Sequence, residues 1–340
     1  SGRKVEIGLV PFGSIGMTVF AVDLWFASRS MASTGLRGLG VFLADHANWR
    51  IMADLFLLAM FSGFYSVPLY ALIQSRCEPS YRARIIAANN ILNALFMVVA
   101  SVMAAALLHE GLTLPQLYMV VGVLNAAVAV YIYTLVPEFL VRFIAWLLIH
   151  SVYRLEQKDL ERIPDEGPAL IVCNHISFVD PVVIFAACRQ PVRFVMDYRI
   201  FETPILSFVF RTVRAIPIAS AKEDPAMMER AFADVATALA AGEIVMIFPE
   251  GSLTKDGELQ RFRPGVTRIL EANPVPVIPM ALSGLWGSFF SRKDGPVMSK
   301  PWRLVPFRKI ALSVGPAVPA AQATPELLHA RVLELRGDWK

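Results

Sequence analysis

Two side chains in the middle of the chain have the types and spacing of a general base and its partner. His175 and Asp180 have four residues between them and follow a short apolar run. A neutral imidazole can take a proton from a hydroxyl group while a carboxylate orients the ring and stabilises the imidazolium. No G-x-S-x-G motif accompanies the pair, so the signature of a covalent intermediate is missing. The pair alone does not decide between catalysis and structure, because Asp180 also suits a helix N-cap.

The segment Phe248-Pro249-Glu250-Gly251-Ser252 adds a turn that suits anion binding. It follows the apolar run 243–247, and Gly251 can adopt backbone angles that other residues avoid. The backbone amides near Gly251 and Ser252 are suited to bind a phosphate group. Three cationic residues follow: Lys255, Arg261 and Arg263. Together with the histidine and the aspartate, this turn predicts acyl transfer to a hydroxyl group.

Composition divides the chain into a very apolar part, 1–136, and an ordinary globular part, 151–340. Hydrophobic residues make up 56% of the 340, charged residues 18%, and the mean hydropathy is +0.53. These values lie outside the usual range of soluble proteins. The net charge of +4 is too small to indicate nucleic acid and suits a membrane surface. Three cysteines without a CxxC pair and five scattered histidines predict neither a disulfide framework nor a metal site, and no cofactor is implied.

Four segments reach the roughly 20 residues that a membrane-spanning helix needs. They are Ile7–Ser28, Ile51–Ile73, Ile85–Leu108 and Leu114–Val136. Lys and Arg precede the first segment, separate the second from the third and follow the fourth, so the positive-inside rule predicts a cytoplasmic globular domain. We expect four transmembrane helices over 1–136, an interfacial helix or linker over 137–156, and an α/β domain over 157–340.

The α/β expectation rests on short apolar runs that alternate with helical patterns. The strand candidates are Ala169–Cys173, Ala215–Ile218, Ile244–Ile247, Val277–Ala281 and Ile310–Val314. The helix candidates are Pro181–Cys188, Ile205–Arg214, Ala226–Ala241 and Pro325–Arg336. Asp180, Thr203 and Asp224 each precede a proline, which predicts three N-caps.

The order of four short motifs resembles that of the glycerolipid acyltransferases, which act on glycerol phosphate and lysophospholipids. The motifs are His175–Asp180, Arg214–Ile218, Phe248–Ser252 and Val275–Pro279. The resemblance implies direct acyl transfer from acyl-ACP or acyl-CoA to the free hydroxyl of a lysophospholipid, with His175 as general base and Asp180 as its partner. It also implies that Glu250 and Gly251 position the acceptor. Further substrate-binding candidates are Asn174, Arg214, Lys222 and Ser252.

Two positions depart from the pattern of this family. Ala219-Ser220 stands in place of the basic residue that usually closes the second motif, which leaves Lys222 as a displaced candidate. Leu253 stands where an arginine usually follows the third motif. These changes favour a zwitterionic headgroup, such as phosphoethanolamine, over a bare phosphate. The Leu253-Thr254 variant resembles bacterial acyl-ACP–phospholipid acyltransferases.

The apolar half resembles the last helices of a major facilitator transporter, as in bacterial fusions of a lysophospholipid transporter to an acyltransferase. The resemblance rests on the four segments and on the loop Tyr81–Ile85. It implies an integral protein of the bacterial inner membrane, further segments before Ser1 and after Lys340, and coupling of acylation to lysophospholipid transport.

Two alternatives remain open. Asp23 in the first segment and the transporter resemblance also fit a lysophospholipid transporter fragment whose acyltransferase-like domain is regulatory and inactive. The same base could instead activate water, as in a thioesterase or another hydrolase. Product analysis separates the two chemistries, because hydrolysis releases a fatty acid whereas transfer builds a diacyl lipid.

Overall fold

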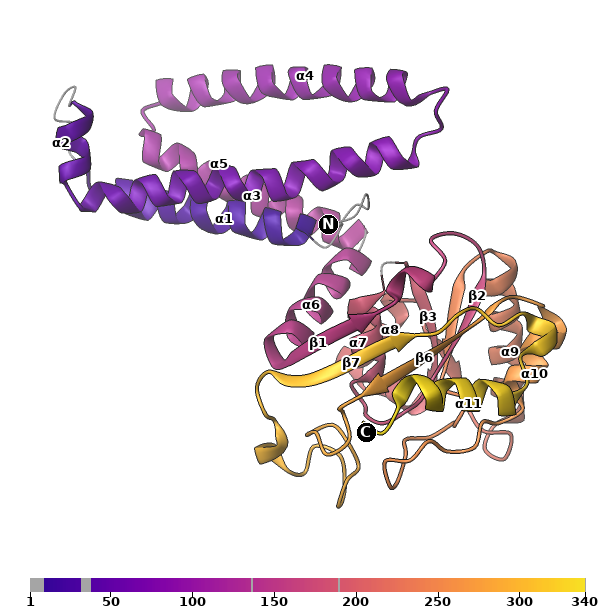
Figure 1. Cartoon of the computed structure of the whole chain (residues 1–340). Helices are drawn as coiled ribbons and strands as arrows, with labels where there is room; N and C mark the ends of the chain where they lie inside the picture. The colour runs from indigo at the N-terminus through magenta and orange to yellow at the C-terminus, as the bar shows by residue number, and fades with distance from the viewer. Residues whose placement is uncertain (1–8, 32–37, 136, 189, 340) are drawn as a thin grey trace. The chain divides into compact units, whose positions relative to one another are not determined.

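The computed structural model describes residues 9–31, 38–135, 137–188 and 190–339. They divide into two compact units, and the division falls between Phe143 and Ile144. Figure 1 shows the long helices of the first unit and the sheet of the second. Ile7 and Val136, the outer ends of two predicted segments, lie outside the described residues.

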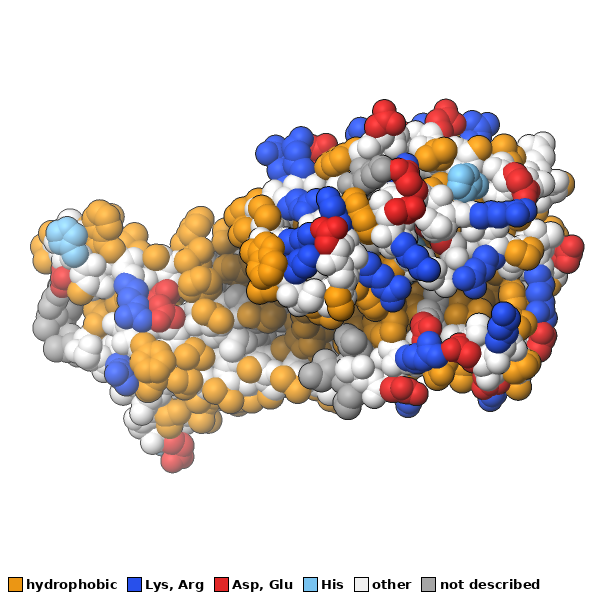
Figure 2. All heavy atoms as spheres, turned by 90° about the horizontal axis from the view of Figure 1, so that it is seen from below, with side chains coloured by type: hydrophobic (Ala, Val, Ile, Leu, Met, Phe, Trp, Pro, Cys, Tyr) orange, Lys and Arg blue, Asp and Glu red, His pale blue; other side chains and the backbone are white. Residues whose placement is uncertain are grey.

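The first unit is helical. Its helices are α1 (Leu9–Ser28), α2 (Leu39–Ala44), α3 (Ala47–Arg76), α4 (Arg82–His109) and α5 (Leu114–Leu135), and α6 (Pro137–Val152) runs across the division. By length and composition, α1, α3, α4 and α5 could each cross a bilayer, which confirms the prediction of four apolar helices. Large apolar side chains such as Phe56, Ile91 and Met97 are exposed on them, a surface that suits lipid. Figure 2 shows hydrophobic side chains over this part and many charged ones over the globular part.

Small and polar residues bring α1 against α3 and α5. Gly13 lies so close to α3 that a Cβ there would stand 2.5 Å from the backbone nitrogen of Tyr65. Asn125 of α5 donates to the carbonyl of Ser14 at 2.9 Å and to the hydroxyl of Thr18 at 2.7 Å. Close backbone approach and interhelical hydrogen bonds are the usual means of helix association in membranes.

The second unit is a seven-stranded sheet with helices around it, so the α/β prediction is confirmed. The strands are β1 (Tyr153–Lys158), β2 (Ala169–Cys173), β3 (Val192–Asp197), β4 (Ile216–Ile218), β5 (Ile244–Ile247), β6 (Val277–Ser283) and β7 (Arg308–Val314). Their order is β1-β7-β6-β2-β5-β3-β4. Strands β2 to β6 are mutually parallel, β7 is antiparallel to β6, and β1 is parallel to β7. The helices are α7 (Asp180–Ala187), α8 (Pro204–Thr212), α9 (Pro225–Ala240), α10 (Gly265–Ala272) and α11 (Pro325–Arg336).

The central strands are apolar throughout because both of their faces are covered. Every residue of β2 and of β5 is buried, which is typical of central strands in parallel sheets. Alternate residues such as Leu170, Val245 and Val277 pack with α9, α10 and α11 in one core cluster. Asp224 caps α9 as predicted, since its carboxylate accepts a hydrogen bond from the Met227 amide at 2.9 Å.

Two strands were not predicted from the sequence. In β3, Val192, Phe194 and Met196 are buried, but Arg193 and Asp197 interrupt the apolar pattern. The guanidinium of Arg193 forms an ion pair with Glu243 next to β5, so its charge is balanced at the sheet. Strand β1 is polar because it is an edge strand that pairs only with β7 among the described residues.

Gly13→Ala should weaken the packing of α1 on α3. The added methyl group meets backbone rather than a flexible side chain, and overpacking of this kind costs about 1–3 kcal/mol. Thermal unfolding of the detergent-solubilised chain should show a lower Tm than for wild type. The matched control is Gly63→Ala in α3, where nothing lies within 4 Å of the added methyl group. Equal Tm values for the two variants would contradict this packing.

Candidate active site

The turn between β2 and α7 holds the predicted base and its partner against each other. The Nδ1 atom of His175 lies 2.9 Å from Oδ2 of Asp180. The imidazole side chain is 20% exposed, whereas the Asp180 carboxylate is completely buried. The pair therefore presents one ring edge to a cavity and keeps the other edge inside the protein.

Asp180 is not the N-cap that the sequence predicted. It is the first residue of α7, and the N-cap position belongs to Val179. The Asp180 carboxylate points back along the turn, where its Oδ2 accepts hydrogen bonds from the amides of Ile176 at 2.7 Å and Ser177 at 2.8 Å. A group that could have capped the helix instead ties the preceding turn around the histidine.

The surroundings of Asp180 define which nitrogen of the histidine carries a proton. Burial raises the pKa of the Asp180 carboxyl, and the hydrogen bonds from His175 and from the two backbone amides oppose that shift. As a carboxylate, Asp180 can only accept, so Nδ1 of His175 donates to it. The lone pair of the neutral ring is then on Nε2, the position that a general base requires.

Glu250 fixes the backbone of the histidine from the neighbouring strand. Because β2 and β5 are adjacent and parallel, the residues that follow them meet at the same edge of the sheet. Oε1 of Glu250 accepts from the His175 amide at 2.6 Å, and Oε2 accepts from the Gln260 amide at 2.8 Å. Burial raises the pKa of Glu250 from 4.5 to about 7, although both amide bonds favour the carboxylate. Glu250 thus joins the histidine to the loop that follows β5.

Asn174, the residue after β2, binds β6, which is the neighbour of β2 on the side away from β5. Its Nδ2 donates to the carbonyl of Leu282 at 2.9 Å, and its Oδ1 accepts from the Leu282 amide at 2.8 Å. The residue is 2% exposed and does not line the cavity beside the histidine. Its side chain therefore ties β2 to β6 at the site.

Gly251 is required by the backbone and by a neighbouring arginine. Its φ of +70° lies in the left-handed region, which favours glycine. A Cβ at this position would lie 2.6 Å from Cζ of Arg263. The backbone amide of Arg263 donates to the Pro249 carbonyl at 2.9 Å, which brings the guanidinium over the turn.

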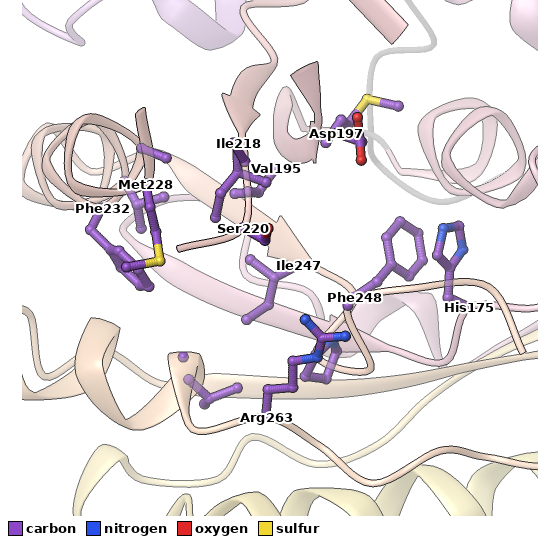
Figure 3. Close-up of a pocket in the computed structure, with 18 of the residues that line it drawn as sticks. His175, Val195, Asp197, Ile218, Ser220, Met228, Phe232, Ile247, Phe248 and Arg263 are labelled. Carbon is purple, nitrogen blue, oxygen red and sulfur yellow. The ribbon is translucent and has the colours of Figure 1, made fainter. Parts of the chain in front are cut away.

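A largely apolar pocket of about 1050 Å³ opens beside the histidine. The ring of Phe248 stacks on the His175 ring, with centroids 4.0 Å apart and planes 16° apart. Figure 3 shows His175 and Phe248 at one end of the pocket, Ile218 and Ile247 along it, and Met228 and Phe232 at the other end. A volume of this size is in the range of small-molecule binding sites.

Not all predicted site residues lie at this pocket. His175 and Gly251 line it, whereas Asp180 and Glu250 act behind the histidine. Ser252 and Lys222 are exposed and do not line it. Arg214 comes before β4, at the amino ends of the parallel strands, whereas His175 lies at their carboxyl ends. There its Nη1 is 3.8 Å from Oε1 of Glu243.

The sequence did not single out the pocket walls, which come from β3, β4, β5, α9 and α10. Their apolar side chains look like ordinary core residues in a sequence. Phe248 could have been recognised, because it opens the motif that contains Glu250. Among the described residues, no group of three or more His, Cys, Asp or Glu side chains could hold a metal ion.

Comparison with known proteins agrees with this geometry. Residues 154–283 match the family model described as Acyltransferase, so the chain contains a domain that is similar to this family. The match begins at the second residue of β1 and ends with the last residue of β6, so it encloses the His175–Asp180 turn and the Glu250 turn.

Curated relatives are similar over the same part of the chain. A chloroplastic 1-acyl-sn-glycerol-3-phosphate acyltransferase of Brassica napus is 28% identical over 148 residues, which cover 43% of this chain and 42% of that protein. The 1-acyl-sn-glycerol-3-phosphate acyltransferase of Pseudomonas aeruginosa is 27% identical over 151 residues, 44% of this chain and 57% of that protein. The matched part thus spans well under two thirds of either relative.

A solved structure is also similar to this chain. The crystal structure of the 1-acyl-sn-glycerophosphate acyltransferase of Thermotoga maritima is 17% identical with a TM-score of 0.47, and the alignment covers 74% of this chain and 99% of that one.

Glu250 should make the unfolding free energy depend on pH. The unfolded carboxyl loses its proton near 4.5, but the folded one keeps it up to about 7, so stability falls as the pH rises between these values. At one pKa unit per 1.36 kcal/mol, the loss is at most about 3 kcal/mol. In thermal unfolding measured from pH 5 to pH 8, Glu250→Gln should lack this part of the decline in unfolding free energy. Glu271→Gln on the exposed surface of α10 is the control, and an unchanged slope in Glu250→Gln would refute the assignment.

Proposed function

We propose that this protein is a membrane-bound O-acyltransferase that moves a fatty acyl group from a thioester donor to the free hydroxyl of a lysophospholipid. The observation that carries the proposal is the His175–Asp180 pair, whose ring lines an apolar pocket large enough for an acyl chain. The acyltransferase domain at residues 154–283 supports the class of reaction.

The proposed reaction is a direct transfer. Nε2 of His175 removes the proton of the acceptor hydroxyl as that oxygen attacks the thioester carbonyl carbon. Asp180 stabilises the imidazolium through Nδ1. When the carbon–sulfur bond breaks, the imidazolium returns its proton to the departing sulfur, which leaves as a thiol. The products are an ester and a free thiol, and His175 is neutral again.

The pocket suits the acyl chain. Its walls are formed mainly by aliphatic and aromatic side chains, among them Val195, Ile218 and Val235. Burial of a methylene group contributes about 0.8 kcal/mol, so a long chain gains considerable binding energy there.

The names of the relatives, which are 1-acyl-sn-glycerol-3-phosphate acyltransferases, support a lysophospholipid acceptor. Acyl-ACP and acyl-CoA are both compatible as donors because the reacting thioester is the same.

The four apolar helices support a membrane location. We place the protein in the bacterial inner membrane with the acyltransferase domain on the cytoplasmic side, where lysophospholipid and acyl donor meet. The family match begins at residue 154, after these helices. Their assignment to a major facilitator transporter, and the coupling of transport to acylation, stay predictions.

His175→Ala should abolish transfer, and Asp180→Asn should lower kcat by about 10²–10⁴-fold through loss of the oriented base. The measurement is the formation of labelled diacyl phospholipid from acyl-ACP or acyl-CoA and lysophosphatidylethanolamine. His329→Gln is the matched control, because this histidine also precedes a carboxylate, Glu334, by five positions. Full transfer by His175→Ala would refute the mechanism, and free fatty acid as the main product would show a hydrolase.

Met228→Trp should shift the preference toward shorter acyl chains. Met228 lies at the end of the pocket remote from the histidine, so a larger side chain there shortens the space (Figure 3). The ratio of kcat/KM for 16-carbon and 12-carbon donors should fall by about tenfold or more, since each lost methylene contact costs about 0.8 kcal/mol. Met227→Trp is the control because Met227 does not line the pocket. An unchanged ratio would place the acyl chain elsewhere.

A further inference from the structure

The two positions that usually carry a basic residue in this family do not supply a cation to the pocket. Leu253 is 5% exposed and forms part of the apolar wall. Ala219 and Ser220 also line the pocket, and the displaced candidate Lys222 does not. A phosphate-bearing substrate at His175 therefore needs positive charge from other residues.

Four arginines line the pocket, two with an acidic partner and two without one among the described residues. Arg199 is held by Glu223, and Arg268 is held by Glu229. The remaining two form no ion pair within the part of the chain that the structure describes. These are Arg263 and Arg292. Their charge is not balanced locally, so it is available to an anionic ligand.

Arg263 reaches the pocket over the Gly251 turn. Its backbone amide is bound to the Pro249 carbonyl at 2.9 Å, and its guanidinium occupies the space that a side chain at position 251 would take. Figure 3 shows the side chain extending from below toward Phe248, which stacks on His175. The absence of a side chain at Gly251 therefore leaves room for the Arg263 guanidinium along the turn.

Arg292 reaches the same pocket from the long loop between β6 and β7. The Phe178 amide donates to the Phe290 carbonyl at 3.1 Å, and Ser177 forms an antiparallel bridge with Ser291. Both contacts are made by the segment between His175 and Asp180. The loop thus fixes Ser291, the residue directly before Arg292, against the turn that holds His175 and Asp180. No local sequence pattern indicates this contact.

We infer that Arg263 and Arg292 together bind the phosphate group of a substrate while its reacting group lies at His175. This inference rests on the proposed function and adds the anion site to it. Guanidinium groups bind phosphate oxygens through charge-assisted hydrogen bonds. The same phosphate chemistry occurs in the acceptor headgroup and in the phosphopantetheine arm of the donor, so kinetics must distinguish the two.

A binding experiment tests the anion site without turnover. Labelled glycerol 3-phosphate is dialysed to equilibrium against the full chain in detergent, as wild type and as Arg263→Gln/Arg292→Gln. The double variant should bind at least about tenfold more weakly, because it loses the charge-assisted hydrogen bonds of two guanidinium groups. Matched controls are Arg261→Gln and Lys293→Gln, neighbours that do not line the pocket. Equal binding by the double variant and the controls overturns the inference.

Steady-state kinetics then identifies the source of the phosphate. If the double variant shows a rise of about tenfold in KM for lysophosphatidylethanolamine while KM for the donor is unchanged, the site binds the acceptor. A rise in KM for the donor alone assigns it to the phosphopantetheine arm. Arg263→Lys should recover part of the loss because it restores the charge. If both KM values stay at wild-type levels while transfer continues, the inference fails and the proposed function stands. If the wild-type protein binds phosphate but does not transfer acyl groups, the proposed function fails and the anion site stands.

Discussion

The site depends on one buried carboxylate. Asp180 is completely buried, and its Oδ2 accepts hydrogen bonds from the His175 ring and from the amides of Ile176 and Ser177. A buried charge needs hydrogen-bond donors, and the turn supplies three of them to Oδ2. The carboxylate therefore shapes the turn and selects the histidine tautomer at once. Its loss would disturb the backbone and the base together.

The parallel sheet explains why this turn can serve as a site. Strand β2 lies between β5 and β6, and each neighbour contributes one anchor to the residues that follow it. Glu250 after β5 binds the His175 amide, and Leu282 in β6 binds the Asn174 side chain. Rigid strand ends hold the imidazole in place, and the largely apolar pocket opens beside it. Loops on a rigid scaffold commonly carry catalytic groups for this reason.

The sequence predicted the parts that local patterns encode. The four apolar helices and most central strands follow from predominantly apolar runs, and the pairing of His175 with Asp180 follows from their spacing. Strand β3 was missed because Arg193 finds its partner, Glu243, across the sheet. The position of Arg292 beside the pocket was missed because the long loop between β6 and β7 returns to the turn between β2 and α7. Contacts between distant segments leave no local pattern, so Asn174 also gave no sign that it clamps β2 to β6.

Because Asp180 accepts from the ring of His175, the proton of the neutral imidazole is on Nδ1 and Nε2 is free to act as a base. Nitrogen-15 NMR of the full chain, labelled at histidine and compared with His175→Ala for assignment, tests it most directly. At pH 8, Nε2 should be unprotonated, and an Nδ1-bound proton should appear far downfield and disappear in Asp180→Ala. A proton on Nε2 of the neutral His175 ring in the wild-type protein would rule out this tautomer and its role as the base.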